Sequence, residues 1–420
     1  MDRMLLADKD DALKTGAILA ARKRHEERKR VMDRLMRLYE NGCDTGDGDK
    51  PNANYYAYIS DTQCGFFLGK PVNYSAAPEL SRGLELLQDA LDRNGEREHN
   101  QRVLRDASVM GFGAEALFLS EQGEVRLTAL DSREITAAYP ESGGDEPAAV
   151  YRFYTACDYS RALPKPENRL DIYTDTEIVR FVERAGGYER QSAALHGFSG
   201  VPIVIFANNR DERGDFERVI PLIKSYNLAQ SLTESDMRGF TNALLMLTGV
   251  DGTDTRELEE ISRKGAVLMP EGGSARWLTK EVNDSFAEVY KTRLRRDIHT
   301  LSLTPDISDE NFAQSQSGVA ISYKLWGAEQ AAATKEDGFR RALRRRMRLI
   351  CPLVVPFAFD LCGVNISFTR NIPQNTAEIA ETMNALSGFL SKRTLISMLP
   401  FVDDPAYEEK MREEENNGGK

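Results

Sequence analysis

The sequence predicts an α+β protein in which a β-rich region is flanked by helices. From 114 to 206 the apolar runs are short, alternating and rich in β-branched and aromatic residues, as expected of strands. Before and after that region, apolar residues recur at helical spacing over long stretches. Two of the helices that follow it enclose a small module at 243–280.

The composition excludes several classes of protein. The chain has 420 residues, 41% of them hydrophobic and 29% charged, enough apolar residues for sizeable cores. No stretch approaches the roughly 20 apolar residues of a membrane span. The first residues carry charges where a secretory signal would be apolar. We therefore expect no membrane association.

The residue types that commonly bind cofactors and metals are scattered along the chain. The five cysteines form no CxxC pair and the four histidines are far apart, which predicts neither a disulfide framework nor a metal site. The stretch Gly65 to Lys70 has three residues between its glycines and Pro71 after the lysine, so it is not a phosphate loop. We expect no cofactor and no catalytic residue. The net charge of -11 argues against tight or sequence-specific DNA binding.

The N-terminal part is predicted to be helical. Residues 10–40 form a densely charged helix with Val31, Leu35 and Leu38 on one face, which suits either a solvated surface helix or a partner-binding surface. A polar loop follows at 41–52. Residues 79–110 give a second helical pattern, and the strands begin after it.

Two capped helices surround the compact module. Asp215 is a predicted N-cap for a helix that reaches about 242, with an apolar stripe from Phe216 to Leu228. The module 243–280 contains apolar strands and a short helix. A second helix spans about 284–302, where Phe286, Tyr290, Leu294 and Ile298 recur every four residues. Its other side carries basic side chains, namely Lys291, Arg295 and Arg296.

A loop at 303–318, with little that would form a core, leads to a long helix at 319–349. The basic run of that helix consists of Arg340, Arg341, Arg344, Arg345, Arg346 and Arg348. It suits a solvated face, an ion-pair network between subunits or direct contact with DNA. Strand-like runs, LVVPFAFDL and VNISFTR, follow Pro352, and short helices are expected at 376–390 and 392–399 before an acidic tail.

Several stretches, in this order, resemble the portal proteins of tailed bacteriophages, in the subfamily typical of siphophages and prophages of Gram-positive hosts. They are YISDTQCGFFLGKPVNY, RDASVMGFGAEALFL, FANNRDERGDFERVIPLIKSYN, LRRDIHTLSLTPDISDENFAQSQSGVAISYKLWGAE, RRALRRRMRL and ISFTRNIPQNTAEIAETMNALSG. The resemblance runs from about 54 to 405. The segment after 375 is short, so the C-terminal crown is expected to be small.

The resemblance implies a portal fold and assigns each part of the chain to it. The assigned parts are a wing at 1–214, stem helices at 215–242 and 281–302, a small α/β clip at 243–280, a tunnel loop at 303–318, a long helix with a return to the wing at 319–375, and a short helical crown with an acidic tail at 376–420. The apolar stripes of the stem helices are then candidate seams between subunits.

The function implied by the resemblance is a ring of twelve subunits at one capsid vertex, a channel for packaging and ejecting double-stranded DNA. The expected partners are further copies of the chain, DNA without sequence preference, the terminase large subunit, a head–tail adaptor, and the major capsid and scaffolding proteins. The expected locations are the virion and, during assembly, the host cytoplasm. The candidate DNA-contacting residues of the tunnel loop are Asp306, Asp309, Glu310, Asn311, Gln314 and Gln316. The alternative is a metal-dependent DNA-processing enzyme using the acidic loop 306–310.

Overall fold

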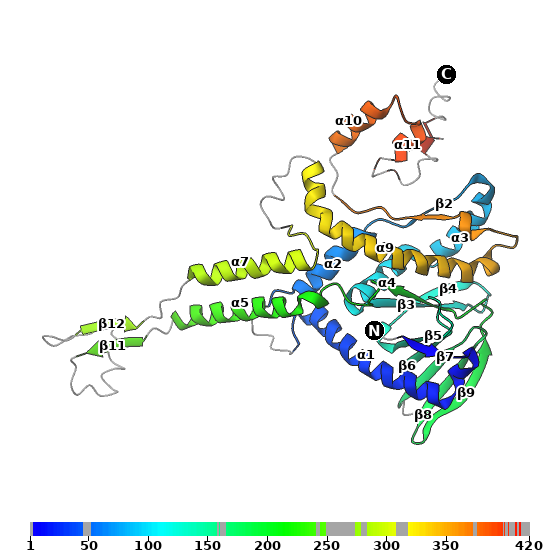
Figure 1. Ribbon diagram of the computed structural model, residues 1–420, viewed down its shortest axis with the longest axis horizontal. Coiled ribbons are helices and arrows are strands. Elements are labelled where there is room, and N and C mark those ends of the chain that lie inside the picture. Colours follow the sequence, from blue (N-terminus) through cyan, green and yellow to red (C-terminus); the bar gives the residue numbers. More distant parts are fainter. Residues whose placement is uncertain are drawn as a thin grey trace.

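A computed structural model describes residues 3–44, 52–157, 159, 165–240, 244–248, 274–278, 284–307, 318–372 and 376–397, with a few single residues up to 412. Helices and sheets form a broad body, from which two helices, α5 (Ile220–Phe240) and α7 (Asp284–Leu301), project side by side (Figure 1). A two-stranded antiparallel sheet of β11 (Leu244–Thr248) and β12 (Ser274–Leu278) lies beyond the far ends of the helices. The predicted α+β class is confirmed.

The N-terminal helices pack one face against the body. A 3-10 helix, η1 (Lys9–Leu13), leads into α1 (Thr15–Asn41), which ends where Gly42 adopts a left-handed φ of 71°. Leu35 and Leu38 are buried as expected, but Val31 is 47% exposed. Met32 takes the place expected of Val31 because its position lies closer to the buried stripe. Next comes α2 (Tyr55–Leu68), capped by the Asn54 side chain, which accepts a hydrogen bond from the amide of Ala57.

The predicted helix over 79–110 is broken in two. After a short 3-10 turn, η2 (Pro78–Leu80), α3 (Ser81–Asp92) and α4 (Glu96–Met110) are separated by Gly95 at φ 62°. The continuous apolar pattern hides the break because both helices bury leucines against the same core. The turn from α4 into β3 is tight: Gly111 has φ 92°, and a Cβ on it would lie 2.0 Å from the carbonyl oxygen of Glu212.

Two sheets form the β-rich region. The larger has the order β1-β5-β6-β7-β8-β9, and β1 is its one parallel edge strand. Its bounds are β1 Met4–Leu6, β5 Ile135–Pro140, β6 Ala149–Cys157, β7 Pro166–Tyr173, β8 Glu177–Arg184 and β9 Gly187–Leu195. The smaller sheet, β10-β3-β4, consists of Ile203–Ala207, Phe112–Leu119 and Val125–Leu130. A 3-10 turn, η3 (Ser132–Glu134), joins the two sheets.

The longest helix, α9 (Gly318–Val354), crosses the body over the smaller sheet (Figure 1). Phe339 of α9 lies in the main core, with its ring centroid 4.7 Å from that of Phe206 and 5.7 Å from that of Phe67. These contacts join α9 to β10 and α2. The long helix thereby holds the sheet and the N-terminal helices together.

The region after α9 corrects one expectation. Residues Leu353–Val354 complete α9, whose final turn includes Pro352, and the rest of LVVPFAFDL forms no strand. Instead the ring of Phe359 packs against Gly83, so its apolar surface is covered without strand pairing. After η5 (Leu361–Gly363), only β13 (Asn365–Ser367) is extended, and it pairs with β2 (Asn73–Ser75). The two expected short helices are α10 (Thr376–Leu386) and α11 (Lys392–Ser397).

Candidate channel site

The two projecting helices pack together near the body and expose apolar side chains farther out. Near the body, Ile223 of α5 and Leu294 and Ile298 of α7 are buried. Farther along, five apolar side chains are between 58% and 71% exposed: Leu228, Leu232, Met237, Phe286 and Val289. Each predicted apolar stripe is therefore part core and part exposed surface. The outer part is available for contact with another molecule.

The basic candidates on α7 have three different environments. Lys291 is buried between the helices, forms an ion pair with Glu288 and lies 3.3 Å from the Gln230 side-chain oxygen. Arg295 is exposed and pairs with Asp306 at 3.4 Å. Arg296 is also exposed. Lys291 therefore helps to hold α5 against α7, whereas the two arginines lie at the surface.

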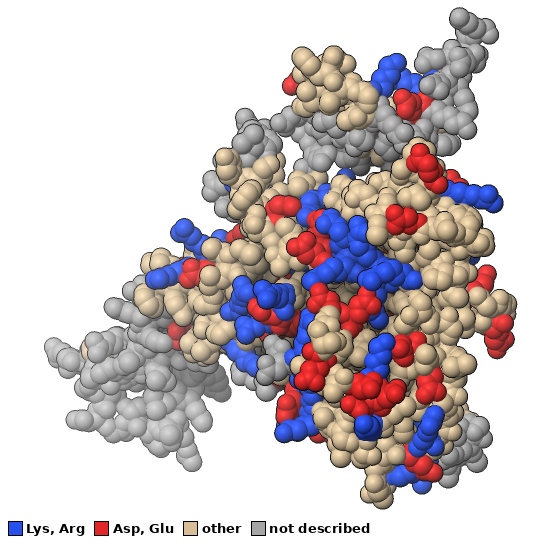
Figure 2. All heavy atoms as spheres, turned by 45° about the vertical axis from the view of Figure 1, so that its right-hand side comes forward, with Lys and Arg blue, Asp and Glu red and all other residues tan. Residues whose placement is uncertain are grey.

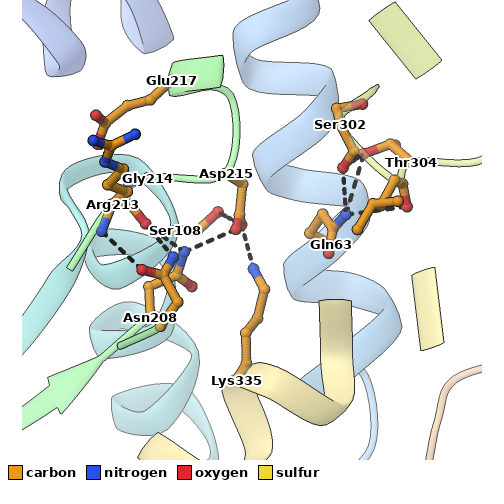
Figure 3. A network of polar contacts seen from close by, with 12 residues as sticks. Gln63, Ser108, Asn208, Arg213, Gly214, Asp215, Glu217, Ser302, Thr304 and Lys335 are labelled. Carbon is orange, nitrogen blue, oxygen red and sulfur yellow. Dashed lines mark hydrogen bonds and ion pairs between the residues drawn. The ribbon is translucent and has the colours of Figure 1, made fainter. Parts of the chain in front are cut away.

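The start of loop 303–318 is anchored to α2 and α7 (Figure 3). Gln63 of α2 donates hydrogen bonds to the carbonyl oxygen of Ser302 at 3.1 Å and to the hydroxyl of Thr304 at 3.2 Å. Tyr58 donates to the carbonyl oxygen of Pro305 at 2.9 Å. Leu303, with φ 56°, has the left-handed backbone that reverses the chain here. The loop therefore leaves the body from a fixed point.

Only one of the six loop candidates lies in the described part of the chain. The carboxylate of Asp306 lies 3.4 Å from the Arg295 guanidinium and 3.7 Å from the His299 imidazole. The others lie outside the described residues, namely Asp309, Glu310, Asn311, Gln314 and Gln316.

A buried polar cluster joins the first projecting helix to α9 (Figure 3). The carboxylate of Asp215 accepts hydrogen bonds from Ser108 at 2.5 Å and Asn208 at 2.8 Å, and it forms an ion pair with Lys335. The side chains of Lys335 and Asp215 are only 3% and 9% exposed. Asp215 is therefore not the predicted N-cap. Instead Glu217, in the short 3-10 turn η4 (Glu217–Val219), accepts from the amide of Gly214 at 2.6 Å.

Sequence reasoning missed Lys335. It occupies the apolar face of α9, in step with Ala332 and Phe339, which are both buried. A lysine at such a position, three and four residues from buried apolar neighbours, is the signal that could have indicated it.

A second buried cluster surrounds Arg346, which has no exposed surface. Its guanidinium lies 2.6 Å from the carboxylate of Glu115, 2.9 Å from Glu96 and 2.8 Å from the side-chain oxygen of Asn100. Burial alone would raise the pKa of Glu115, but Arg346 and His99 outweigh it and hold the pKa below its usual value. The cluster therefore fixes α9 to α4 and β3 through fully paired charges.

The other arginines of the basic run also have partners within the chain. Arg340 pairs with Glu336, Arg341 with Asp145 at 3.3 Å, Arg345 with Glu146 at 2.5 Å and Arg348 with Glu146 at 2.6 Å, and Arg344 donates to the carbonyl of Val364 at 3.5 Å. Intrachain pairing was not among the three interpretations of this run. Arg341 and Arg348 remain 63% and 59% exposed, so contact with another molecule is still open to them.

The described ranges contain neither a metal-binding cluster nor a membrane-spanning helix. Within them, no group of three or more His, Cys, Asp or Glu side chains is arranged to hold a metal ion. Within the same ranges, no helix is both long and apolar enough to cross a bilayer. In the described site, buried ion pairs hold the helices together. The start of the loop is anchored, and apolar side chains are exposed on the projecting helices. These are the features of a structural subunit built for assembly.

Two projecting helices with a small sheet beyond them, an anchored loop and a long helix follow one another along the chain, in the order expected from the resemblance to phage portal proteins (Figure 1). The family model described as "Phage portal protein, SPP1 Gp6-like" matches residues 21–420, and the chain belongs to this family. The chain is similar to the portal protein of Bacillus phage SPP1, at 22% identity over 399 residues, covering 89% of this chain and 77% of that one.

A second relative is the portal protein of Clostridium phage phiCD119, at 22% identity over 298 residues, covering 68% of this chain and 65% of that protein. The resemblance to portals of phages with Gram-positive hosts is thus confirmed. Among solved structures, a chain from "Neck of native GTA particle computed with C12 symmetry" has 12% identity and a TM-score of 0.47, covering 83% of this chain and 89% of that one. Portal proteins are structural components of the virion, and this chain is one of them.

Proposed function

We propose that this chain forms a ring of twelve subunits at one capsid vertex, through which double-stranded DNA is packaged and ejected. The observation that carries the proposal is the exposed apolar surface of α5 and α7. Monomeric proteins rarely expose such a surface, and a ring requires that one face of each subunit cover a different face of the next. Membership of the portal family supports the same conclusion.

In this proposal the parts of the chain have the roles inferred from the resemblance. Residues 215–242 and 281–302 form the stem, 243–280 the clip, 303–318 the tunnel loop, and 1–214 the wing. The remaining parts are 319–375, the long helix with its return to the wing, and 376–420, the short crown and tail. The clip is the proposed docking surface for the terminase large subunit and later for the head–tail adaptor. The wing would meet the capsid and scaffolding proteins.

The charge of the chain suits a channel in which DNA slides. With 21 residues, α5 is about 31 Å long. DNA of that length carries about 18 phosphate charges, and a strongly basic lining would hold it by releasing counterions. The net charge of -11 and the pairing of Arg295 with Asp306 leave few free cations on the described stem. The expected contacts with DNA are weak and independent of sequence.

The enzyme alternative gains no support from Asp306. A metal-binding carboxylate would need other oxygen ligands, but Asp306 lies 3.4 Å from the Arg295 guanidinium, which would repel a divalent cation. Cleavage of plasmid DNA by the purified protein with Mg²⁺ or Mn²⁺, absent in the Asp306→Asn variant, would restore that alternative.

Replacing Leu232 tests the ring directly. Leu232→Glu puts a charge into the proposed seam and should convert rings to monomers, because an unpaired charge is costly to bury. Leu195→Glu is the matched control, since Leu195 is 83% exposed on β9, away from the stem. Mass photometry and electron micrographs report the assembly, and circular dichroism reports folding. Intact rings in the Leu232 variant, or only monomers and dimers in the unmodified protein at every salt concentration, would overturn the proposal.

A further inference from the structure

A cleft lined by arginines lies between the second half of α9 and the turn that joins β5 to β6. Its volume is about 270 Å³, and five arginines line it: Arg3, Arg341, Arg344, Arg345 and Arg348. Basic side chains gather at the level of α9 on the face shown in Figure 2, with acidic side chains along their border. The cleft is thus a locally basic site in a chain whose net charge is -11.

The chain covers this cleft with two of its own carboxylates. Asp145 lies 3.2 Å from Arg3 and 3.3 Å from Arg341. Glu146 lies 2.5 Å from Arg345 and 2.6 Å from Arg348. The side chains of Asp145 and Glu146 are 63% and 51% exposed, so water screens these pairs and their net contribution is small. Carboxylates from another molecule can therefore compete with them.

Arg345 has unused hydrogen-bonding capacity in the cleft wall. Its side chain is 9% exposed, and its Nη2 donates to the carbonyl oxygen of Val201 at 3.0 Å. Its Nη1 forms the ion pair with Glu146 at 2.5 Å, and its Nε makes no hydrogen bond within the described part of the chain. Burial lowers the pKa of the Arg345 guanidinium, against the opposing effect of Glu146. The neighbouring Arg346, by contrast, is fully paired and its pKa is raised, because Glu115 and Glu96 outweigh burial.

We propose that this cleft binds an acidic segment of a partner protein, whose carboxylates replace Asp145 and Glu146 on the arginines. A carboxylate accepts strong, charge-assisted hydrogen bonds from a guanidinium, as Asp145 does from Arg341 within the chain itself. The side chains of Asp145 and Glu146 would then leave the arginines when the partner binds. This inference is independent of whether DNA passes through the ring.

A peptide fits the cleft better than DNA for two reasons. The groups that occupy the arginines within the chain are carboxylates, so the spacing already suits them. A DNA backbone, by contrast, could reach the exposed Arg341 and Arg348 but not the buried Arg345.

The test measures the fluorescence anisotropy of a labelled twelve-residue peptide of alternating Glu and Ala, with the full-length protein in excess. A Gln–Ala peptide is the uncharged control. Because exposed ion pairs contribute so little, the double variant Asp145→Asn with Glu146→Gln should bind the acidic peptide about fivefold more tightly. Loss of a charge-assisted contact in Arg348→Gln should weaken binding about tenfold.

The matched control is Arg102→Gln, because Arg102 is 57% exposed and paired with Glu98 in the same way. It should leave binding unchanged. Equal binding of the two peptides, or equal loss in the Arg348 and Arg102 variants, would overturn the inference. Duplex DNA that displaces the peptide and loses affinity with the same Arg348 change would also overturn it, and would assign the cleft to nucleic acid. Circular dichroism of each variant confirms that the fold is retained.

Discussion

The residues that hold the candidate site together are buried charges, and the sequence does not show them as such. Lys, Arg, Asp and Glu are usually at the surface. Asp215 was therefore predicted to be a helix cap, Arg346 was grouped with the rest of the basic run, and Lys335 was missed. Their burial depends on partners that are distant in sequence: Asp215 and Lys335 are 120 residues apart, and Arg346 and Glu115 are 231 apart. Local patterns carry no information on such pairs. The predicted DNA-contacting residues, by contrast, depended on the family resemblance.

Breaking the buried pair from one side should destabilise the protein more than removing both charges. Lys335→Met leaves the Asp215 carboxylate buried without its cation, at an expected cost of about 3–5 kcal/mol in the free energy of unfolding. Adding Asp215→Asn should recover part of that loss, because no unpaired charge is then buried. Urea unfolding at one fixed protein concentration measures all the variants. Strictly additive losses in the double variant would show that the two residues are not coupled.

At the scale of elements, the long regular helices were predictable, whereas the break between α3 and α4 and the sheet connections were not. The stem helices and α9 were found because their apolar residues recur regularly over many turns. Sheet order depends on contacts distant in sequence, such as β1 pairing with β5 and β2 with β13, which no periodicity shows. The expected strand at LVVPFAFDL was wrong because apolar runs as short as this one do not distinguish a strand from a helix end or a packed loop.

The turn between α4 and β3 should tolerate no side chain at position 111. Gly111→Ala places a Cβ 2.0 Å from the Glu212 carbonyl oxygen and also requires a left-handed backbone. Gly95→Ala has the same backbone requirement at φ 62°, but there a Cβ would meet no atom within 4 Å among the described residues. Gly95→Ala should therefore cost about 1 kcal/mol, and Gly111→Ala clearly more. Equal melting temperatures for the two variants would mean that Glu212 moves aside at little cost.

At the scale of the whole molecule, the proposal of a channel depends on membership of the portal family. The proposed wing, stem and clip carry no catalytic or binding motif in their sequence that distinguishes them. The structure adds how the proposed tunnel loop, 303–318, is attached: Gln63 and Tyr58 fix its first residues, and Arg295 pairs with Asp306. A change in charge farther along the loop should therefore act on DNA and leave this attachment intact.

Reversing the charge of the tunnel loop should slow DNA without affecting assembly. The double variant Asp309→Lys with Glu310→Lys changes each subunit by four charges, from -2 to +2 at these positions. A ring of such loops would attract phosphates and release counterions on contact, so DNA should stall most strongly at low ionic strength. Packaging into empty shells, followed by measurement of the encapsidated length and the rate, gives the result directly.

The matched control is Glu124→Lys with Glu189→Lys, an equal change of charge at exposed wing positions, which should leave both quantities unchanged. If the loop variant packages equal lengths at equal rates at every salt concentration, the loop does not meet the DNA. The lining of the channel would then have to be sought on α5 and α7.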